Sequence, residues 1–218
     1  MNQTEGLAEN RRLHPGLVEL EKRYPWPQEK PNAGEVPIGL VGWMTWDVQA
    51  ALIHFSIWDE PRIYLELGSW FGLSMRMWLG NTPMGIGIAV DTWEGSADFK
   101  AREDIIPYLP ISQQLFFDEC WLYRDRLIPL KMRSLEGMQI VYDQGVRPNL
   151  IYIDADHTYE AVLADFSLAL DLFPGAMIMG DDYLHPESSI FGVHRAVNDV
   201  ARERGIGIMN SGHCWWIA

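Results

Sequence analysis

The chain has 218 residues, of which 48% are hydrophobic and 22% charged, and its formal net charge is −13. This length suffices to bury the core of one compact α/β domain, and the composition is that of an ordinary globular protein. The negative charge disfavours a nucleic-acid partner, because proteins that bind the phosphate backbone need a basic face.

Two further absences narrow the class of protein. No apolar run approaches the length of about 18 residues that indicates a membrane-spanning helix, and Met1 to Arg12 are polar, so we expect neither a transmembrane span nor a signal peptide. The two cysteines, Cys120 and Cys214, lie far apart and lack a C-x-x-C partner. We therefore expect no thiolate metal site and no disulfide, and a cytoplasmic location.

The hydrophobic pattern predicts a short arm followed by one domain. Residues 1–38 are polar and contain five prolines, and they are expected to form an N-terminal arm or cap with one helix at 16–23. The domain, 39–218, begins with an expected helix at 46–58 capped by Thr45, a strand at 63–67, a helix at 71–79, a strand at 86–90, an irregular stretch at 92–110 and a helix at 112–126. Its second half is expected to contain strands at 126–130, 150–154, 176–179, 206–209 and 214–217, with helices at 134–143, 158–172 and 190–204. Repeated βα units imply an α/β fold with a parallel sheet between helices.

The segment Ile-Tyr-Leu-Glu-Leu-Gly-Ser-Trp-Phe-Gly (63–72) predicts a buried strand and a tight turn. The strand carries one acid, Glu66, and the turn contains Gly68 and Gly72, which permit a positive φ and a close approach of a ligand to the backbone. The next strand ends at Asp91, where an acid can bind a ribose. The wide glycine spacing suits a nucleoside without a pyrophosphate, such as S-adenosylmethionine (SAM), better than NAD. A plain strand-to-helix turn is the alternative.

Carboxylates follow two neighbouring strands of the predicted sheet. Asp154 and Asp156 follow the strand at 150–154, and Asp181 and Asp182 follow the strand at 176–179. Carboxyl ends of parallel strands meet at one edge, so Asp154, Asp181 and Asp182 are expected to converge. Clustered carboxylates repel one another unless a cation neutralises them, and oxygen ligands suit Mg²⁺, Ca²⁺ or Mn²⁺. The alternative is that Asp156 and Asp182 only cap the following helices.

The loop after the strand at 150–154 also holds two candidates for a general base. The imidazole of His157 has an ordinary pKa near 6.5, which suits proton transfer near neutral pH. Asp156 is its neighbour and either orients His157 or acts as the base itself. We favour His157, and both assignments stay open at this point.

Five segments together carry a family resemblance. They are Leu-Glu-Leu-Gly-Ser-Trp-Phe-Gly (65–72), Ala-Val-Asp-Thr-Trp-Glu-Gly (89–95), Ile-Asp-Ala-Asp-His-Thr-Tyr-Glu-Ala-Val (153–162), Gly-Asp-Asp-Tyr (180–183) and Gly-Val-His-Arg-Ala-Val (192–197). Their order resembles the class I SAM-dependent methyltransferases, in particular the branch of small-molecule and antibiotic-sugar O-methyltransferases. The resemblance covers roughly residues 40–218, and its most specific part is the pair Asp-x-Asp-His-x-Tyr and Asp-Asp-Tyr.

The resemblance implies a fold, an activity and a set of site residues. The implied fold is a Rossmann-like three-layer sandwich with a seven-stranded, mostly parallel sheet whose last strand is antiparallel. The implied activity is O-methylation of a small-molecule hydroxyl, with SAM as cofactor and a divalent cation, Mg²⁺. The implied cofactor-binding residues are Glu66, Gly68, Ser69, Trp70, Gly72, Asp91, Thr92, Trp93, Ser134 and Asp154. The implied metal ligands are Asp154, Asp181 and Asp182, and the implied base is Asp156 or His157.

The family pattern also assigns places within the site. Glu66 is expected near the methionine amine of SAM, Asp91 on the ribose hydroxyls and Ser134 beside the adenine. The segment Gly-Trp-Met-Thr (42–45) matches the part of such enzymes that closes over SAM. The first 38 residues match no family pattern, so the acceptor stays open.

Two alternative functions remain beside this one. A NAD-dependent oxidoreductase on a similar sheet is disfavoured because Trp70 stands where a pyrophosphate loop needs a small residue. A non-catalytic SAM-binding protein is disfavoured because the acidic residues and His157 are all present. The sequence leaves open whether the chain forms a homo-oligomer.

Overall fold

The computed structural model describes residues 2–56, 62–188 and 191–218. The strands within these ranges are β1 (Ile63–Leu67), β2 (Ile86–Asp91), β3 (Leu127–Lys131), β4 (Leu150–Ile153), β5 (Met177–Gly180), β6 (Ile208–Ser211) and β7 (Cys214–Ile217). Every predicted strand is present, with ends that differ from the predicted ends by at most two residues. β1 is buried along its whole length, as expected for a parallel strand covered on both faces.

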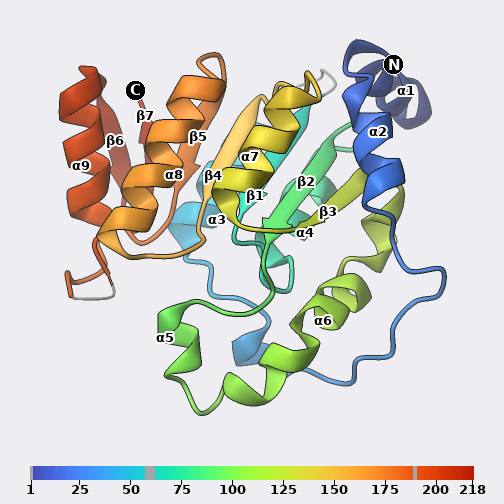
Figure 1. Ribbon diagram of the computed structural model, residues 1–218, viewed down its shortest axis with the longest axis horizontal. Helices are drawn as coiled ribbons and strands as arrows, with labels where there is room; N and C mark the ends of the chain where they lie inside the picture. Colours follow the sequence, from blue (N-terminus) through green and yellow to red (C-terminus); the bar gives the residue numbers. More distant parts are fainter. Residues whose placement is uncertain (1, 57–61, 189–190) are drawn as a thin grey trace.

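The strands of the described residues form one seven-stranded sheet with the order β3-β2-β1-β4-β5-β7-β6 (Figure 1). The first five strands in this order run parallel. The last strand of the chain, β7, is antiparallel to both of its neighbours, β5 and β6. The predicted Rossmann-like sheet, with its antiparallel last strand, is therefore confirmed.

Helices of the described residues cover both faces of this sheet (Figure 1). The α-helices are α1 (Gln3–Leu13), α2 (Gly16–Arg23), α3 (Trp46–Ser56), α4 (Leu73–Asn81), α5 (Ala97–Lys100), α6 (Ser112–Glu119), α7 (Ser134–Asp143), α8 (Tyr159–Leu172) and α9 (Val193–Arg204). Short 3₁₀ helices occur at Ile38–Leu40, Ile106–Ile111 and Trp121–Arg126. Residues 57–58 and 190, the outer ends of two predicted helices, lie outside the described residues.

Three predictions about helices need correction. α1 was not predicted, although its start is written in the sequence: Asn2 and Glu5 form a capping box in which each side chain accepts a hydrogen bond from the other backbone N–H. The helix predicted over 112–126 ends at Glu119, and the chain turns at Cys120 into a 3₁₀ helix. The stretch 92–110 was predicted to be irregular, yet it contains α5 and the start of a 3₁₀ helix.

Alternate side chains of β1 pack into two separate cores. Ile63, Leu65 and Leu67 belong to the core under α2, α7, α8 and α9. Tyr64 belongs to the core under α3 and α4 on the other face. Successive side chains of a strand point to opposite faces of the sheet, so Glu66 lies on the same side as Tyr64.

The N-terminal residues pack against the same core rather than apart from it. Leu17 and Leu20 of α2 are fully buried in the first core. Trp26 donates a 2.6 Å hydrogen bond from its indole to the carbonyl of Leu127, on the edge strand β3. The segment from α2 to Trp26 therefore packs against the sheet and its β3 edge, and the domain boundary near residue 38 stays a prediction.

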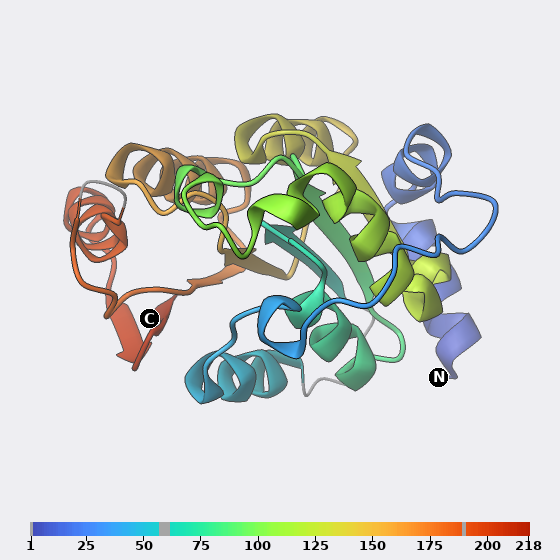
Figure 2. The ribbon, with the colours of Figure 1, turned by 90° about the horizontal axis from the view of Figure 1, so that it is seen from below.

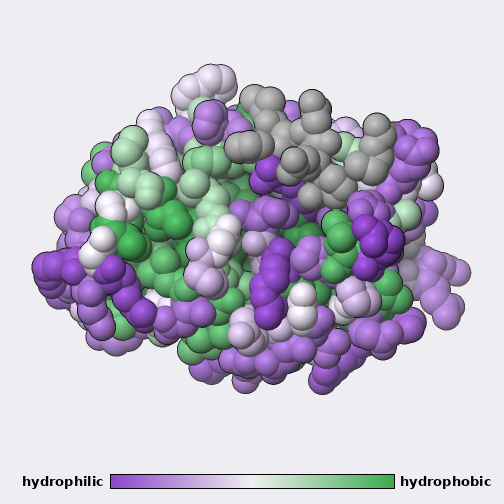
Figure 3. All heavy atoms as spheres, turned by 90° about the horizontal axis from the view of Figure 1, so that it is seen from above, coloured by the Kyte–Doolittle hydropathy of each residue, from purple (hydrophilic) through white to green (hydrophobic). Residues whose placement is uncertain are grey.

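The surface at the amino ends of the parallel strands is mixed in character. Hydrophilic residues occupy most of the rim of this surface, and hydrophobic residues are exposed between them (Figure 3). Among the residues that the structure describes, no helix is long and apolar enough to cross a membrane.

The carboxyl ends of the parallel strands lie at the opposite edge. β2 points towards α5 and α6, which pass beneath this edge (Figures 1 and 2). The strand order reverses between β1 and β4, since β1 pairs with β2 on one side and with β4 on the other. Open α/β sheets bind ligands at such a switch point.

Candidate active site

A cavity of about 1260 Å³ opens at the carboxyl edge of the sheet. Its walls come from the loops that follow β1 to β5, from residues 41–45, 94–97 and 99–100, and from the first turns of α7 and α8. Single small-molecule sites usually occupy roughly 300–1,000 Å³. This cavity therefore has room for a nucleoside cofactor and a second small molecule.

The turn after β1 has the predicted glycine geometry at Gly68, which lines the cavity. Its φ is +89°, and a Cβ at this position would lie 2.0 Å from the carbonyl oxygen of Asp154. Only glycine allows the loops after β1 and β4 to approach this closely. Gly72 has a φ of +79° and precedes α4, but it packs against Cys120 and does not line the cavity.

Asp91 connects the loops that follow β1 and β2. Its Oδ2 accepts a 2.8 Å hydrogen bond from the backbone N–H of Trp70, and its Oδ1 accepts a 2.6 Å bond from that of Trp93. Both tryptophans have left-handed backbones, with φ of 45° and 51°. Burial raises the pKa of Asp91, and the backbone donors oppose this rise. Each carboxylate oxygen has a second lone pair, so Asp91 can still accept hydrogen bonds from a ligand.

Several of the predicted cofactor-binding residues line the cavity. They are Gly68, Ser69, Trp70, Asp91, Thr92, Ser134 and Asp154. Trp93 does not: it is 3% exposed and donates its indole N–H to the carbonyl of Trp70 at 2.8 Å. Trp93 thus holds the loop after β1 in place without contacting the cavity.

Glu66 also lies outside the cavity lining, and its expected place near the methionine amine of SAM stays a prediction. Because it faces the α4 side of β1, it is fully buried, and its Oε1 accepts hydrogen bonds from Tyr64 and from Ser74. Burial raises the pKa of Glu66 to about 7. Ser74 does line the cavity, so its hydroxyl connects Glu66 to the site.

The carboxylates after β4 and β5 come together as predicted for neighbouring strands. The hydroxyl of Tyr152 donates towards Oδ2 of Asp154 at 3.4 Å and towards Oδ2 of Asp181 at 3.3 Å. Burial raises the pKa of Asp154 well above its ordinary value. Burial also raises the pKa of Asp181 to about 6, and the charge of Asp182 adds to this rise.

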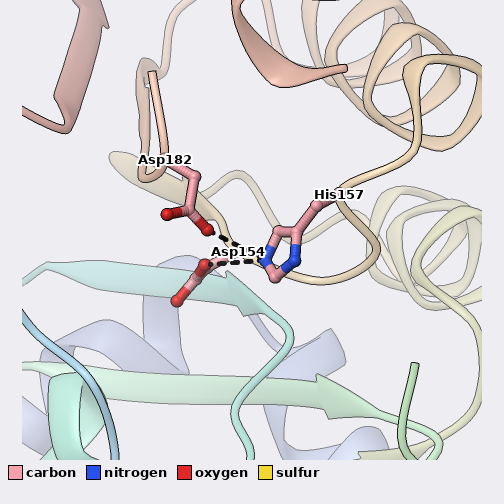
Figure 4. Close-up of side chains that lie close together, drawn as sticks. All are labelled: Asp154, His157 and Asp182. Carbon is pink, nitrogen blue, oxygen red and sulfur yellow. Dashed lines mark ion pairs between the residues drawn. The ribbon is translucent and has the colours of Figure 1, made fainter. Parts of the chain in front are cut away.

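His157 joins this cluster, and Asp156 does not. The His157 Nε2 lies 3.5 Å from Oδ1 of Asp154 and 3.3 Å from Oδ2 of Asp182, so both carboxylates face one nitrogen (Figure 4). The imidazole stacks on the ring of Phe191, with the two ring centroids 4.8 Å apart. The Oδ1 of Asp156 instead accepts a 2.8 Å bond from the backbone N–H of Thr158, just before α8. The N-cap residue of α8 is Thr158 and no side chain makes a capping bond there, so the capping alternative is not observed at Asp156. His157 is the candidate base that contacts the acids.

The possible metal ligands form two overlapping groups. Asp154, His157 and Asp182 make one, and Asp181, Asp182 and His213 make the other. Neither group within the described residues contains all three predicted aspartates, and a histidine completes each. His213 was missed in the sequence. It precedes β7, and because β7 runs antiparallel beside β5, the start of one lies next to the end of the other.

Comparison with known proteins identifies the family. A family model for a methyltransferase domain matches residues 65–183, which is more than half of the chain. The chain belongs to this methyltransferase family. The match spans the glycine turn, Asp91 and the acidic cluster, and it favours a methyltransferase over the oxidoreductase alternative. No curated protein sequence matches this methyltransferase significantly.

Solved structures share its fold over nearly their whole length. An O-methyltransferase from Bacillus cereus, in complex with S-adenosylhomocysteine (SAH), has a TM-score of 0.51 at 17% identity and covers 94% of this chain and 90% of its own. The SAH-bound methyltransferase PaMTH1 of Podospora anserina has a TM-score of 0.56 at 13% identity, with 92% of each chain covered. The O-methyltransferase TomG from Streptomyces achromogenes, in complex with SAM, has a TM-score of 0.52 at 15% identity. The match covers 98% of this chain and 88% of TomG. At these identities the likeness establishes the fold.

Proposed function

We propose that this methyltransferase transfers a methyl group from SAM to a hydroxyl oxygen of a small molecule. The observation that carries the proposal is the cavity that contains both the Gly68 turn with Asp91 and the acidic cluster around Asp154 and Asp182. The neighbours that bind SAH or SAM support the choice of cofactor, and the O-methyltransferases among them support oxygen as the acceptor atom.

The order of the strands suggests the order of the subsites along the cavity. Ser134 follows β3, Asp91 ends β2, Gly68 follows β1, Asp154 follows β4 and Asp181 follows β5. We place the adenine of SAM beside Ser134, its ribose beside Asp91 and its methionine part beside Gly68. The acceptor then lies near Asp154 and Asp181, beside His157.

The donor set of the acidic cluster fits a divalent cation. Carboxylate oxygens suit Mg²⁺ or Mn²⁺, and imidazole nitrogen tolerates Mn²⁺ better than Mg²⁺. Burial and the neighbouring carboxylates raise the pKa of Asp154 and of Asp181, so a bound cation would stabilise their ionised forms. We propose that Asp154, Asp181 and Asp182 hold the cation, with His213 beside them. When bound, such a cation lowers the pKa of an oxygen that it contacts.

His157 is the proposed general base. Bound SAM supplies a methyl on a positively charged sulfur, which passes to the acceptor oxygen as the carbon–sulfur bond breaks. The Nε2 of His157 receives the proton that this oxygen loses. Asp154 and Asp182, at 3.5 Å and 3.3 Å, stabilise the resulting imidazolium. Stacking on Phe191 fixes the plane of the ring.

Two segments cover the cavity and are proposed to exclude water. Trp43, from the predicted closing segment, meets Phe99 of α5 with ring centroids 5.5 Å apart, and Phe99 meets Trp70 at 4.7 Å. Trp70 in turn donates its indole N–H to the carbonyl of Leu40 at 3.0 Å. This aromatic wall gives the acceptor an apolar contact and excludes water from the reacting methyl group. Residues 1–38 are proposed to be an arm that supports the sheet edge.

A labelled-methyl assay tests the proposed reaction. The protein is incubated with methyl-labelled SAM, Mg²⁺ and a panel of small phenols and sugars, and the product is analysed by fragmentation in a mass spectrometer. We expect a methyl ether. Asp182→Asn should abolish transfer, whereas Glu136→Gln, at an exposed acid elsewhere in the lining, should not. A methyl group on nitrogen or carbon would refute O-methylation.

A further inference from the structure

One buried acid of the cavity wall has no part in the account above. Asp165 lies on α8, is 4% exposed and lines the cavity. Burial raises the pKa of Asp165 to about 7; the nearby hydroxyl of Ser134 opposes this rise, and the charge of Asp156 adds to it. An ionised carboxyl that is buried at the wall of a cavity is costly unless hydrogen-bond donors reach it.

The surroundings of Asp165 form an apolar slot. Ala161 lies on the same face of α8 as Asp165, because it is four residues before it, and Ala164 directly precedes Asp165. Both line the cavity, as do Met132 and Leu135 from the β3-to-α7 connection. α7 and α8 pack side by side over the sheet, which brings these two walls together (Figure 1). Small alanines on one wall leave room for a flat ring.

The charge pattern of the slot selects one kind of ring. A carboxylate accepts hydrogen bonds and donates none, and Ser134 can satisfy only part of its capacity. A ring that enters this slot must therefore carry a donor at its edge. Ser134 follows β3, at the end of the cavity beyond Asp91, where the base of a nucleoside would lie if its ribose is held by Asp91.

We propose that Asp165 accepts a hydrogen bond from the exocyclic amino group of the adenine of the cofactor and thereby selects a 6-aminopurine over a 6-oxopurine. The inference rests on the proposed binding of SAM. A 6-oxopurine turns a carbonyl oxygen, which is an acceptor, towards a carboxylate that needs a donor. Sites built around one buried hydrogen bond reject analogues that lack it.

Calorimetry with two product analogues tests this role. SAH is compared with S-inosylhomocysteine, in which a 6-oxo group replaces the 6-amino group, in alkaline buffer where the carboxyl is ionised. The wild-type protein should prefer SAH by roughly 10- to 100-fold, the effect of leaving a buried charged acceptor unpaired. Asp165→Asn offers an amide that can also donate, so the preference should shrink to a few-fold or vanish.

Two matched variants separate this effect from a general loss of binding. Glu160→Gln changes an exposed acid of the same helix that also lines the cavity, and it should keep the wild-type ratio of affinities. Asp91→Ala should weaken both ligands equally, because they share the ribose. If Asp165→Asn fails to fold, as judged by circular dichroism, Asp165→Ala replaces it and should show the same loss of preference.

Each outcome decides the inference. Equal affinity of the wild-type protein for the two ligands, or a full preference in a folded Asp165 variant, would overturn it while SAM binding stands. If the wild-type protein binds neither ligand, the proposed function itself fails, and the inference fails with it.

Discussion

The backbone N–H of Trp70 donates a 2.8 Å hydrogen bond to Oδ2 of Asp91. This bond joins the loop after β1 to the end of β2, across two neighbouring strands. It also holds a tryptophan at a φ of 45°, a conformation that few non-glycine residues adopt. The residue that is proposed to bind the ribose is thus the residue that fixes the glycine turn.

The first prediction concerns Asp91 as a ligand for the cofactor. Asp91→Ala removes an acceptor from the ribose hydroxyls, and it should weaken SAM binding by about 1.5–3 kcal/mol in calorimetry. Glu94→Gln, at a neighbouring exposed acid of the lining, should leave the affinity nearly unchanged. Unchanged affinity in a folded Asp91→Ala protein would refute the ribose role.

The second prediction concerns the close approach at Gly68. Gly68→Ala places a Cβ 2.0 Å from the Asp154 carbonyl at a φ of +89°, so it should lower the free energy of unfolding by at least about 2 kcal/mol. Gly34 is the matched control, because its φ of +88° is nearly the same and nothing lies within 4 Å of its Cβ position. Gly34→Ala should cost only about 1 kcal/mol. Equal losses in urea unfolding would show that the contact with Asp154 does not matter.

The third prediction follows from the buried Glu66. Its pKa is about 7 in the folded protein against an ordinary value of 4.5, so the folded state holds the proton more tightly. The stability that this confers is present below pH 4.5 and is lost as the pH rises through 7. Its size is about 3 kcal/mol, from 1.36 kcal/mol per pKa unit.

Glu66→Gln isolates this contribution, because glutamine can still accept hydrogen bonds from Tyr64 and Ser74. The unfolding free energy of the wild-type protein, measured relative to the variant in urea, should fall across this pH window. A difference that is flat with pH would show that Glu66 titrates normally.

The sequence predicted the parts of this site that depend on strand order. Glycine at position 68 and acids at 91, 154, 181 and 182 all end or follow parallel strands, and parallel strands share one carboxyl edge. Hydrophobic runs locate such strands well, so their tips could be placed without coordinates.

What the sequence did not reveal depends on the direction of single side chains. Glu66 and Gly68 are two residues apart, yet Glu66 faces α4 and Gly68 lines the cavity, because the strand ends between them. His213 required knowledge that β7 lies beside β5. Asp165 looks like any polar residue of an amphipathic helix until α7 packs against α8.

The fourth prediction concerns the divalent cation. Treatment with EDTA should abolish methyl transfer, and Mg²⁺ should restore it, whereas SAM binding should survive chelation because the cation serves the acceptor. Asp182 belongs to both ligand groups, so Asp182→Asn should weaken Mn²⁺ binding in calorimetry by at least about 10-fold. Glu160→Gln is again the control. Full activity in the chelated enzyme would refute the metal site.

The fifth prediction separates the two candidate bases. His157→Ala should reduce turnover by roughly 10²–10⁴-fold, the usual contribution of a positioned base, and should leave SAM affinity nearly intact. Asp156→Asn should cost less, because an asparagine oxygen can still accept the bond from the Thr158 N–H. The reverse order, with an active His157→Ala protein and an inactive Asp156→Asn protein, would make Asp156 the base.

The most direct test of the account is a thermal unfolding series with SAM, SAH and NAD⁺, each with and without Mg²⁺. A ligand that binds the native state raises the melting temperature in proportion to its affinity and concentration. We expect SAM and SAH to raise it, NAD⁺ to leave it unchanged, and Mg²⁺ to add little to the shift by SAM. An unchanged melting temperature with SAM and SAH, or an equal rise with NAD⁺, would contradict the assignment of this cavity to a methyl donor.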